Sequence, residues 1–292
     1  MNSTPARSFS AKDVPPSATL AAAWPRALQC LLPIIAAAIL GACASTTPGG
    51  RSQMAAPELI SALYSSLDLN LTLASLAPVV TSCEGVQCQV DKGFERQVLR
   101  LGTRLAETAY ATYPQLKERI PQFTFIVAEK IEAGSSSDAS GVIVIYRGVR
   151  KARLDEETLA YLIAREMGHV ISRHHDEKSA ATIISSLIAQ LVLAPANLAR
   201  GVAFIASSTA GAFGKDFVAS GNALEQRKEA DVIALELLLK QGWNDTDIVD
   251  SLLDYSSRLG KDPWSKEVEK TALRLNNYKS ADAVALVESK AN

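Results

Sequence analysis

Residues that could bind a metal and activate water are concentrated in one segment, Leu159 to His175. Its apolar residues recur at helical spacing and Asp155 precedes it as a candidate N-cap, so the segment is predicted to be one amphipathic helix. On that helix Arg165 and His169 lie about one turn apart, with Glu166 beside Arg165. A histidine in place of Arg165 would complete H-E-x-x-H, two zinc ligands on one face with a glutamate general base between them. The arginine breaks the pattern, because a guanidinium stays protonated and offers no lone pair to a metal.

The segments around this helix predict an α+β fold that is mostly helical with a small β-sheet. Two strands are expected ahead of the helix, at Phe123 to Ala128 and at Val142 to Tyr146, with the loop Glu132 to Ser140 between them. Leucine, valine and alanine recur at helical spacing elsewhere. The helices expected from this spacing are Glu58 to Val80, Gly93 to Tyr113, Glu225 to Lys240 before Gly242, and two or three between Asn244 and Asn292.

These segments, from about Lys92 to Leu275, resemble peptidase family M48, the zincins that include HtpX-like and CAAX-prenyl proteases. The resemblance is carried by the two strands, the Arg-Glu-Met-Gly-His helix with its Arg173-His174 tail, and Arg227-Lys-Glu-Ala-Asp. It implies a mostly helical, zincin-like metallopeptidase domain. Active members of the family use zinc, and the edge of the small sheet holds the substrate backbone by strand addition.

The resemblance also implies a role for each motif residue. The family reads E-x-x-A-D where this chain carries Arg227, and the first glutamate of that motif is the third zinc ligand. Arg165 and Arg227 therefore occupy two of three ligand positions, His169 retains the third, and Glu166 stands at the general-base position. Two guanidiniums near a divalent ion disfavour its binding, since one unit-charge pair at about 4 Å costs roughly 4 kcal/mol at an effective dielectric near 20. No cofactor is expected, with zinc held by a rearranged ligand set as the alternative.

In place of the metal we expect a salt-bridge cluster of Arg165, Glu166, Arg227 and Asp231 that keeps two helices in register. Asp231 follows Arg227 by four residues, so the two could bridge directly on one helix face. Asp262 stands where many members carry a histidine that lines the site, and it is expected beside the same cluster.

Neighbouring residues are not expected to rebuild the metal site. Glu229 lies two positions from Arg227, about 200° around the helix, so it should face away. His174 and His175 lie more than one turn beyond His169 on the expected helix.

The N-terminus predicts export. Residues 1–42 contain positive charges followed by an apolar run from Leu28 to Ala42, which ends in a sequence that resembles a bacterial lipobox before Cys43. Residues 1–42 are thus read as a lipoprotein signal peptide, with Cys43 as the lipidated residue. An uncleaved anchor helix and a soluble chain with an apolar start are the alternatives. Residues 43–56 are read as a flexible tether rich in Ser, Thr, Pro and Gly, and residues 57–292 as the peptidase-like domain.

Cysteine usage and charge are consistent with an exported protein. After export, Cys83 and Cys88 remain as a pair that an oxidising periplasm would allow to form a local disulfide, with a zinc half-site as the alternative. Ala44 after Cys43 resembles lipoproteins sorted to the outer membrane of Gram-negative-type bacteria, facing the periplasm. The net charge of −1 argues against a nucleic-acid partner.

Residues 179–199 and 201–214 contain no charged side chain. They are read as alanine-rich helices near the site or the lipid surface, with a membrane-spanning helix as the alternative.

Three functions follow from these observations. The first is a non-catalytic lipoprotein that binds a protein or peptide of the cell envelope through the former substrate groove and reaches the membrane through its lipid anchor. The second is an active zinc metalloendopeptidase, engaged in proteolysis and protein quality control, with a rearranged ligand set. The third is a purely structural envelope lipoprotein.

Overall fold

The computed structural model describes residues 44–74, 86–185 and 223–278. The chain divides into two compact units, Met1–Ala42 and Cys43–Asn292, and every described residue belongs to the second. The predictions for the signal peptide, for lipidated Cys43, for the Cys83–Cys88 disulfide and for most of the uncharged insertion lie outside the described residues or side chains. Among the described residues, no helix is both long enough and apolar enough to cross a bilayer.

A three-stranded sheet lies at the centre of the domain. The strands are β3 (Thr124–Ala128), β4 (Ser135–Ser137) and β5 (Val142–Tyr146), in the order β3-β5-β4. The two predicted strands, β3 and β5, pair with each other and run parallel, and β4 pairs antiparallel with β5. The loop predicted between β3 and β5 therefore contains an edge strand, which serine-rich sequence does not signal.

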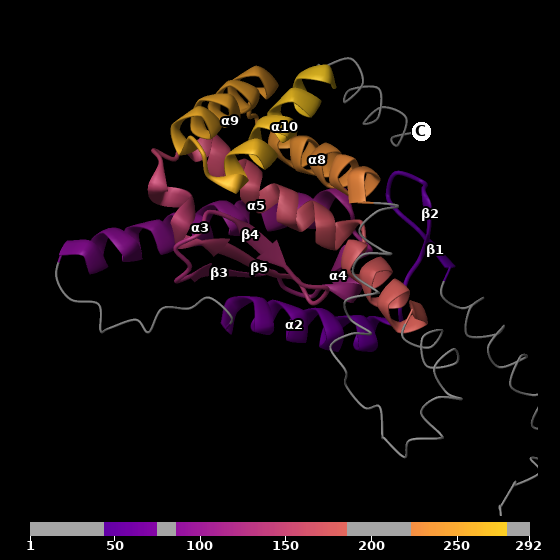
Figure 1. Ribbon diagram of the computed structural model, residues 1–292. Helices are drawn as coiled ribbons and strands as arrows, with labels where there is room; N and C mark the ends of the chain where they lie inside the picture. The colour runs from indigo at the N-terminus through magenta and orange to yellow at the C-terminus, as the bar shows by residue number, and fades with distance from the viewer. Residues whose placement is uncertain (1–43, 75–85, 186–222, 279–292) are drawn as a thin grey trace, which may run out of the picture. The chain divides into compact units, whose positions relative to one another are not determined.

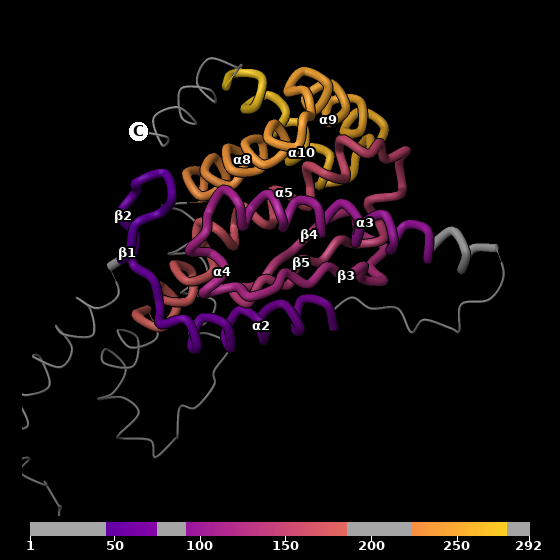
Figure 2. The backbone as a smooth tube through the Cα atoms, turned by 180° about the vertical axis from the view of Figure 1, so that it is seen from behind, coloured from indigo at the N-terminus to yellow at the C-terminus, as the bar shows by residue number. Residues whose placement is uncertain are grey.

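Helices cover both faces of this sheet (Figures 1 and 2). α2 (Glu58–Ala74) lies on one face, where its Leu69 packs against Val144 and Tyr146 of β5. α3 (Val86–Thr112) and α5 (Glu156–Ile171) lie on the other, where Ile143 and Ile145 join the main core. The alternation along β5 thus separates the two layers, because successive strand residues point to opposite faces. The short segments α4 (Leu116–Arg119) and η1 (Arg147–Lys151) follow α3 and β5.

Three further helices pack over α5: α8 (Ala223–Lys240), α9 (Asp245–Leu259) and α10 (Pro263–Asn277). Gly168 permits the close crossing of α5 and α8, because a Cβ there would lie 2.6 Å from the carbonyl oxygen of Ala230. α8 ends before Gly242, whose φ of 85° confirms the predicted glycine stop. The helices predicted after Asn244 are also present, and Pro263 begins the second of them.

The helix that carries His169 is shorter than predicted. α5 begins after Asp155 and ends at Ile171, and Arg173 takes a positive φ of 62°. Residues 174–185 form a new helical segment. The prediction of one continuous helix to His175 was wrong, because a left-handed residue turns the chain where side-chain periodicity shows no break.

The segment predicted to be a flexible tether is part of the folded domain. β1 (Ala44–Thr46) and β2 (Ser52–Met54) form an antiparallel hairpin that leads into α2 (Figure 2). Arg51 fixes the hairpin through ion pairs to Glu177 and Glu229 at 2.8 and 2.9 Å. The tether prediction was wrong because small polar residues can also form a hairpin when one of them provides such long-range contacts.

Candidate functional site

Arg165 is buried between α5, α8 and α10. Its Nε donates to Asp231 at 3.1 Å and its Nη2 donates to Glu267 at 3.1 Å. Asp231 is completely buried and also accepts hydrogen bonds from Tyr161 Oη at 2.7 Å and Arg274 Nε at 2.8 Å. We call these five residues the arginine cluster. Its two guanidiniums and two carboxylates satisfy one another, which is the condition for burying charge at acceptable cost.

The pKa directions in the arginine cluster agree with this pairing. Burial lowers the pKa of Arg165, but nearby Asp231 and other acidic groups outweigh it and raise the pKa above its ordinary value. Burial also raises the pKa of Tyr161 well above 10, and the charge of Asp231 adds to this effect. Arg165 therefore stays protonated, and Tyr161 donates to Asp231 as a neutral phenol.

Arg227 lies at the edge of this cluster and 43% of its side chain is exposed. Its Nε is 3.5 Å from Glu267 Oε1, so Glu267 lies between the two arginines that were expected at ligand positions. The predicted cluster is thus correct for Arg165 with Asp231 and wrong for a direct bridge from Arg227 to Asp231. Glu267 could not be predicted from the sequence, because it is on α10 and reaches the site only by tertiary packing.

Glu166 lies in a different environment from its neighbour Arg165. Its two carboxylate oxygens accept hydrogen bonds from Ser135 Oγ and Ser137 Oγ of β4, both at 2.7 Å. Ser137 Oγ is also 2.9 Å from His175 Nε2. The prediction that Glu166 joins the salt-bridge cluster was wrong, because successive helix residues point about 100° apart and this one faces the sheet.

His169 is linked to the N-terminal hairpin through two further side chains. Its Nδ1 is 2.9 Å from His174 Nδ1, and His174 Nε2 is 2.9 Å from Glu229 Oε2. Glu229 also accepts from Arg51 and Thr47. Since a carboxylate can only accept, His174 Nε2 carries the proton in this pair. For neutral rings, His169 then donates from Nδ1, and its Nε2 keeps the lone pair.

Electrostatics keep the His169 ring neutral. Burial, and then repulsion from His174 and Arg165, lower the pKa of His169 well below 6.5. Burial raises the pKa of Glu229, but hydrogen bonds from His174 and Arg51 outweigh it and lower the pKa to about 2. Glu229 was predicted to face away from the site. It does not reach the position of Arg227, but the turn at Arg173 brings His174 against it.

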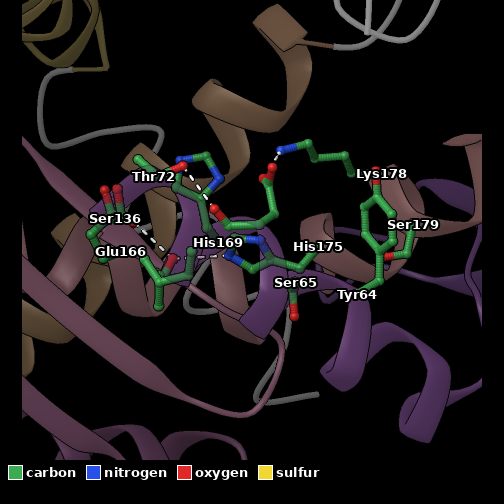
Figure 3. Close-up of a pocket in the computed structure, with 12 residues that line it drawn as sticks. Tyr64, Ser65, Thr72, Ser136, Glu166, His169, His175, Lys178 and Ser179 are labelled. Atoms are coloured by element: carbon green, nitrogen blue, oxygen red, sulfur yellow. Dashed lines mark hydrogen bonds and ion pairs between the residues drawn. The ribbon is translucent and has the colours of Figure 1, made fainter. Parts of the chain in front are cut away.

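A cavity of about 300 Å³ lies between α2, β4, the end of α5 and residues 174–185 (Figure 3). Glu166, His169 and His175 project into it from one side, and α2 forms the opposite wall. The residues that line it are Tyr64, Ser65, Asp68, Leu69, Thr72, Ser136, Ser137, Glu166, His169, His175, Lys178 and Ser179. Neither Arg165 nor Arg227 is among them.

These residues do not fit a zinc ion held as H-E-x-x-H proteins hold it. In the described part of the chain, no group of three His, Cys, Asp or Glu side chains is placed to hold a metal ion. Arg165 and Arg227, which were expected at two ligand positions, are paired with carboxylates, and His174 lies between His169 and Glu229 with one nitrogen toward each. One imidazole ring cannot offer both nitrogens to one ion.

Asp262 lies outside this cavity. Its carboxylate caps α10 by accepting from Trp264 N at 2.9 Å, and it pairs with Lys151 at 3.2 Å. The expectation that it lies beside the arginine cluster was wrong; its role here is that of an N-cap. Glu267, one turn further along α10, provides the contact to Arg165 instead.

Comparison with known proteins agrees with the motif order. A family model described as peptidase family M48 matches residues 95–271, more than half of the chain. No curated protein matches the sequence.

Proposed function

Because the chain belongs to peptidase family M48, we propose that it is a metallopeptidase-like protein that binds an extended protein or peptide segment without cleaving it. The observation that carries this proposal is the state of Arg165. It stands at a ligand position of the family, is buried, and directs Nε and Nη2 to carboxylates at 3.1 Å. Replacing those contacts by a metal would leave Asp231 and Glu267 without a partner that they now have, which is costly for buried charge.

The peptide-binding part of the proposal rests on the edge strand β4. Gly134 O accepts from Tyr146 N and Asp138 N donates to Val142 O, so these residues face β5. Because backbone groups alternate in direction along a strand, Ser135 and Ser137 direct their N–H and C=O groups away from β5. An extended peptide could add to this edge beside the cavity, as in strand addition.

The walls of the cavity suit a polar backbone rather than a large apolar ligand. Hydroxyl groups of Ser136 and Ser137 line one side, and the only cation among the lining residues, Lys178, pairs with Asp68 at 2.7 Å. With that pair balanced, the carboxylate of Glu166 is the remaining charge among the lining residues, so the site offers mainly hydrogen bonds. Such a site recognises main chain and small polar side chains, with affinity provided mainly by the strand contacts.

The location of this activity in the cell is also a proposal. The apolar run before Cys43 supports a lipid anchor at that residue, and the second compact unit begins at the same residue. We infer a protein anchored to the membrane and facing the periplasm, whose partner is another envelope protein or peptide.

A proline substitution tests the edge strand. Ser135→Pro removes an N–H that points away from β5, so the pairing with β5 should remain. Ser135→Ala is the matched control, because it removes the same hydroxyl bond to Glu166 and keeps the N–H. With fluorescently labelled casein as an unfolded probe, we expect Ser135→Pro to bind several-fold to about tenfold more weakly than Ser135→Ala, since one hydrogen bond contributes about 0.5–1.5 kcal/mol. Fluorescence anisotropy of the full-length protein measures this.

Two results would contradict the proposal. Equal casein affinities of the two variants, or no casein binding by the unsubstituted protein, would favour a purely structural role. Casein cleavage that a chelator and Glu166→Gln both abolish, together with stoichiometric zinc in the purified protein, would establish the active peptidase instead.

A further inference from the structure

α2 exposes most of its leucines and buries two serines. Leu59, Leu63, Leu67 and Leu71 are 73%, 61%, 62% and 69% exposed, and they follow one another at four-residue spacing along the outer side. The side that packs on the domain carries Leu69 and two buried serines, Ser61 and Ser65. A helix on the surface of a water-soluble domain normally shows the opposite arrangement.

Hydrogen bonds hold α2 in this orientation. Ser61 Oγ donates to Asp176 Oδ1 at 2.5 Å, and Ser65 Oγ accepts from Ala139 N at 2.9 Å. Ser66 Oγ donates to Asp138 at 2.8 Å. Rotating the helix to bury the leucines would leave Asp176 and the Ala139 amide without these partners, a cost of about 1–3 kcal/mol for each buried group. The exposed leucines are therefore a fixed feature of the surface.

The shape of the leucine stripe fits a flat apolar medium. Each step of four residues turns about 40° around the helix, so the stripe from Leu59 to Leu71 covers an arc of roughly 120°, with Ile60 inside it. A partner helix would contact a narrow seam with a repeat of about 3.5 residues. A broad arc on a single helix is the pattern of segments that lie in the membrane interface.

The N-terminal hairpin places this stripe close to the proposed anchor. Ala44, which follows Cys43, lies opposite Met54, and α2 begins four residues after Met54. Met54 is itself 41% exposed, and Arg51 holds the hairpin against Glu177 and Glu229. From the strand spacing and the length of four residues, Ala44 and the start of α2 are within about 20 Å. A lipid attached at Cys43 would therefore enter the bilayer near α2.

We propose that α2 lies in the membrane interface, with Leu59, Leu63, Leu67 and Leu71 among the acyl chains, so that the cavity behind α2 opens beside the lipid surface. This rests on the lipid anchor proposed above and does not require peptide binding. The contact is apolar rather than ionic. The charged residues of α2 are two acidic ones, Glu58 and Asp68, and Asp68 is already paired with Lys178. It should therefore be nearly independent of anionic lipid and of salt.

Photo-crosslinking in vesicles tests the contact. The full-length protein is reconstituted in phosphatidylcholine vesicles with benzoylphenylalanine in place of Leu67 or, as the matched control, of Leu273, which is 51% exposed on α10. We expect lipid adducts, identified by mass spectrometry, at position 67 and not at position 273. Adding phosphatidylglycerol should change the yield of lipid adducts little. The same holds for about 0.5 M salt, at which the Debye length is below about 5 Å.

A second pair of variants uses the same readout with the photoreactive residue in place of Ile60. Leu63→Gln, Leu67→Gln and Leu71→Gln together should reduce lipid adducts about tenfold or more, since burying each leucine contributes about 1.5 kcal/mol or more. Leu99→Gln, Leu224→Gln and Leu273→Gln remove three exposed leucines from other helices and should leave the yield unchanged.

Each other outcome would overturn the proposal. A covalent dimer at position 67 would assign the stripe to a second copy of the chain, and an adduct with another protein in native membranes would assign it to that partner. Equal lipid labelling at positions 67 and 273, or none at either, would exclude α2 as the membrane contact. None of these results bears on casein binding at β4, so failure here is distinct from failure of the proposed function.

Discussion

The two sides of α5 contact different kinds of side chains. On one side, Arg165 lies in the arginine cluster, where two guanidiniums meet two carboxylates and little space remains. On the other, Glu166 and His169 face a cavity lined by hydroxyl and imidazole groups. Adjacent residues of one helix thus belong to a closed ionic cluster and to an accessible pocket.

Under the proposed function, this difference separates the side of α5 that has lost its metal ligands from the side that keeps the groove. The side chain of Arg165, which was expected at a ligand position, packs between α5, α8 and α10. The residues at the general-base position and at the retained ligand position stay at the cavity surface, where contact with a peptide needs no metal. We expect stability to depend on the first side and binding on the second, and the following substitutions test that division.

The largest effect is expected at Asp231. Asp231→Asn keeps the shape of the side chain but removes the charge that faces Arg165 and Arg274, so buried guanidiniums lose their compensation. We expect the free energy of unfolding to fall by about 3–5 kcal/mol in urea denaturation. Asp250→Asn, at an exposed carboxylate of α9, is the control and should change it by less than about 0.5 kcal/mol. A loss below 1 kcal/mol at Asp231, less than about one hydrogen bond, would mean that the cluster is not a stability element.

Mild acid should destabilise the pocket side. Burial, followed by the charges of Lys178 and His174, lowers the pKa of His175 to about 4. Its unfolded-state pKa is near 6.5, so below that pH the unfolded chain binds a proton that the folded chain does not. Stability is then complete above pH 6.5 and declines as the pH falls toward 4, by at most about 3 kcal/mol.

Urea denaturation between pH 7 and pH 5 measures this decline, and His175→Gln should make it shallower. The lowered pKa of Glu229, about 2, acts in a separate window, because its contribution is lost only as the pH falls from about 4.5 toward 2. An unchanged slope in His175→Gln would exclude His175 as its source.

A smaller effect is expected at Glu166. Glu166→Gln keeps one acceptor for the hydroxyls of Ser135 and Ser137 and removes no ion pair, so the loss of unfolding free energy should be about 1 kcal/mol. The comparison with Asp231→Asn is direct, since both changes neutralise a carboxylate beside α5. A loss as large as that at Asp231 would abolish the proposed division between the two sides.

The smallest effect is expected at Arg227. Its side chain is 43% exposed and its distance to Glu267 is 3.5 Å, so Arg227→Ala should change the free energy of unfolding by less than about 0.5 kcal/mol. Arg165→Ala, with the same residue type at the other ligand position, should cost several times more. Equal losses of unfolding free energy in the two variants would show that the difference in exposure between Arg227 and Arg165 does not set their contributions to stability.

Much of the fold could be predicted because local patterns carry it. The alternation in β5 and the helical spacing in α5 and α8 each reflect one buried face, which the sequence records directly. The edge strand β4 was missed because three serines show no such pattern. The hairpin at residues 44–54 was missed because Arg51 holds it through partners more than 120 residues away.

The candidate site was predicted in part for the same reason. Sequence motifs identified Arg165, Glu166, His169 and Asp231. Their partners could not be identified, because Glu267 comes from α10, Ser135 and Ser137 come from β4, and Arg51 comes from the hairpin.

The amino-acid sequence alone determined which groups can ionise, accept a proton or hold a metal, and it predicted permanently charged guanidiniums at two ligand positions. It also determined the family, through motifs whose spacing is local. Only the tertiary structure decided what each group faces. Neighbouring helix residues point about 100° apart, so Arg165 lies in a closed ionic cluster and Glu166 faces a cavity. The turn at Arg173 and contacts between distant elements complete these surroundings. The same long-range hydrogen bonds decided that α2 buries Ser61 and Ser65 and exposes the four leucines of its outer stripe.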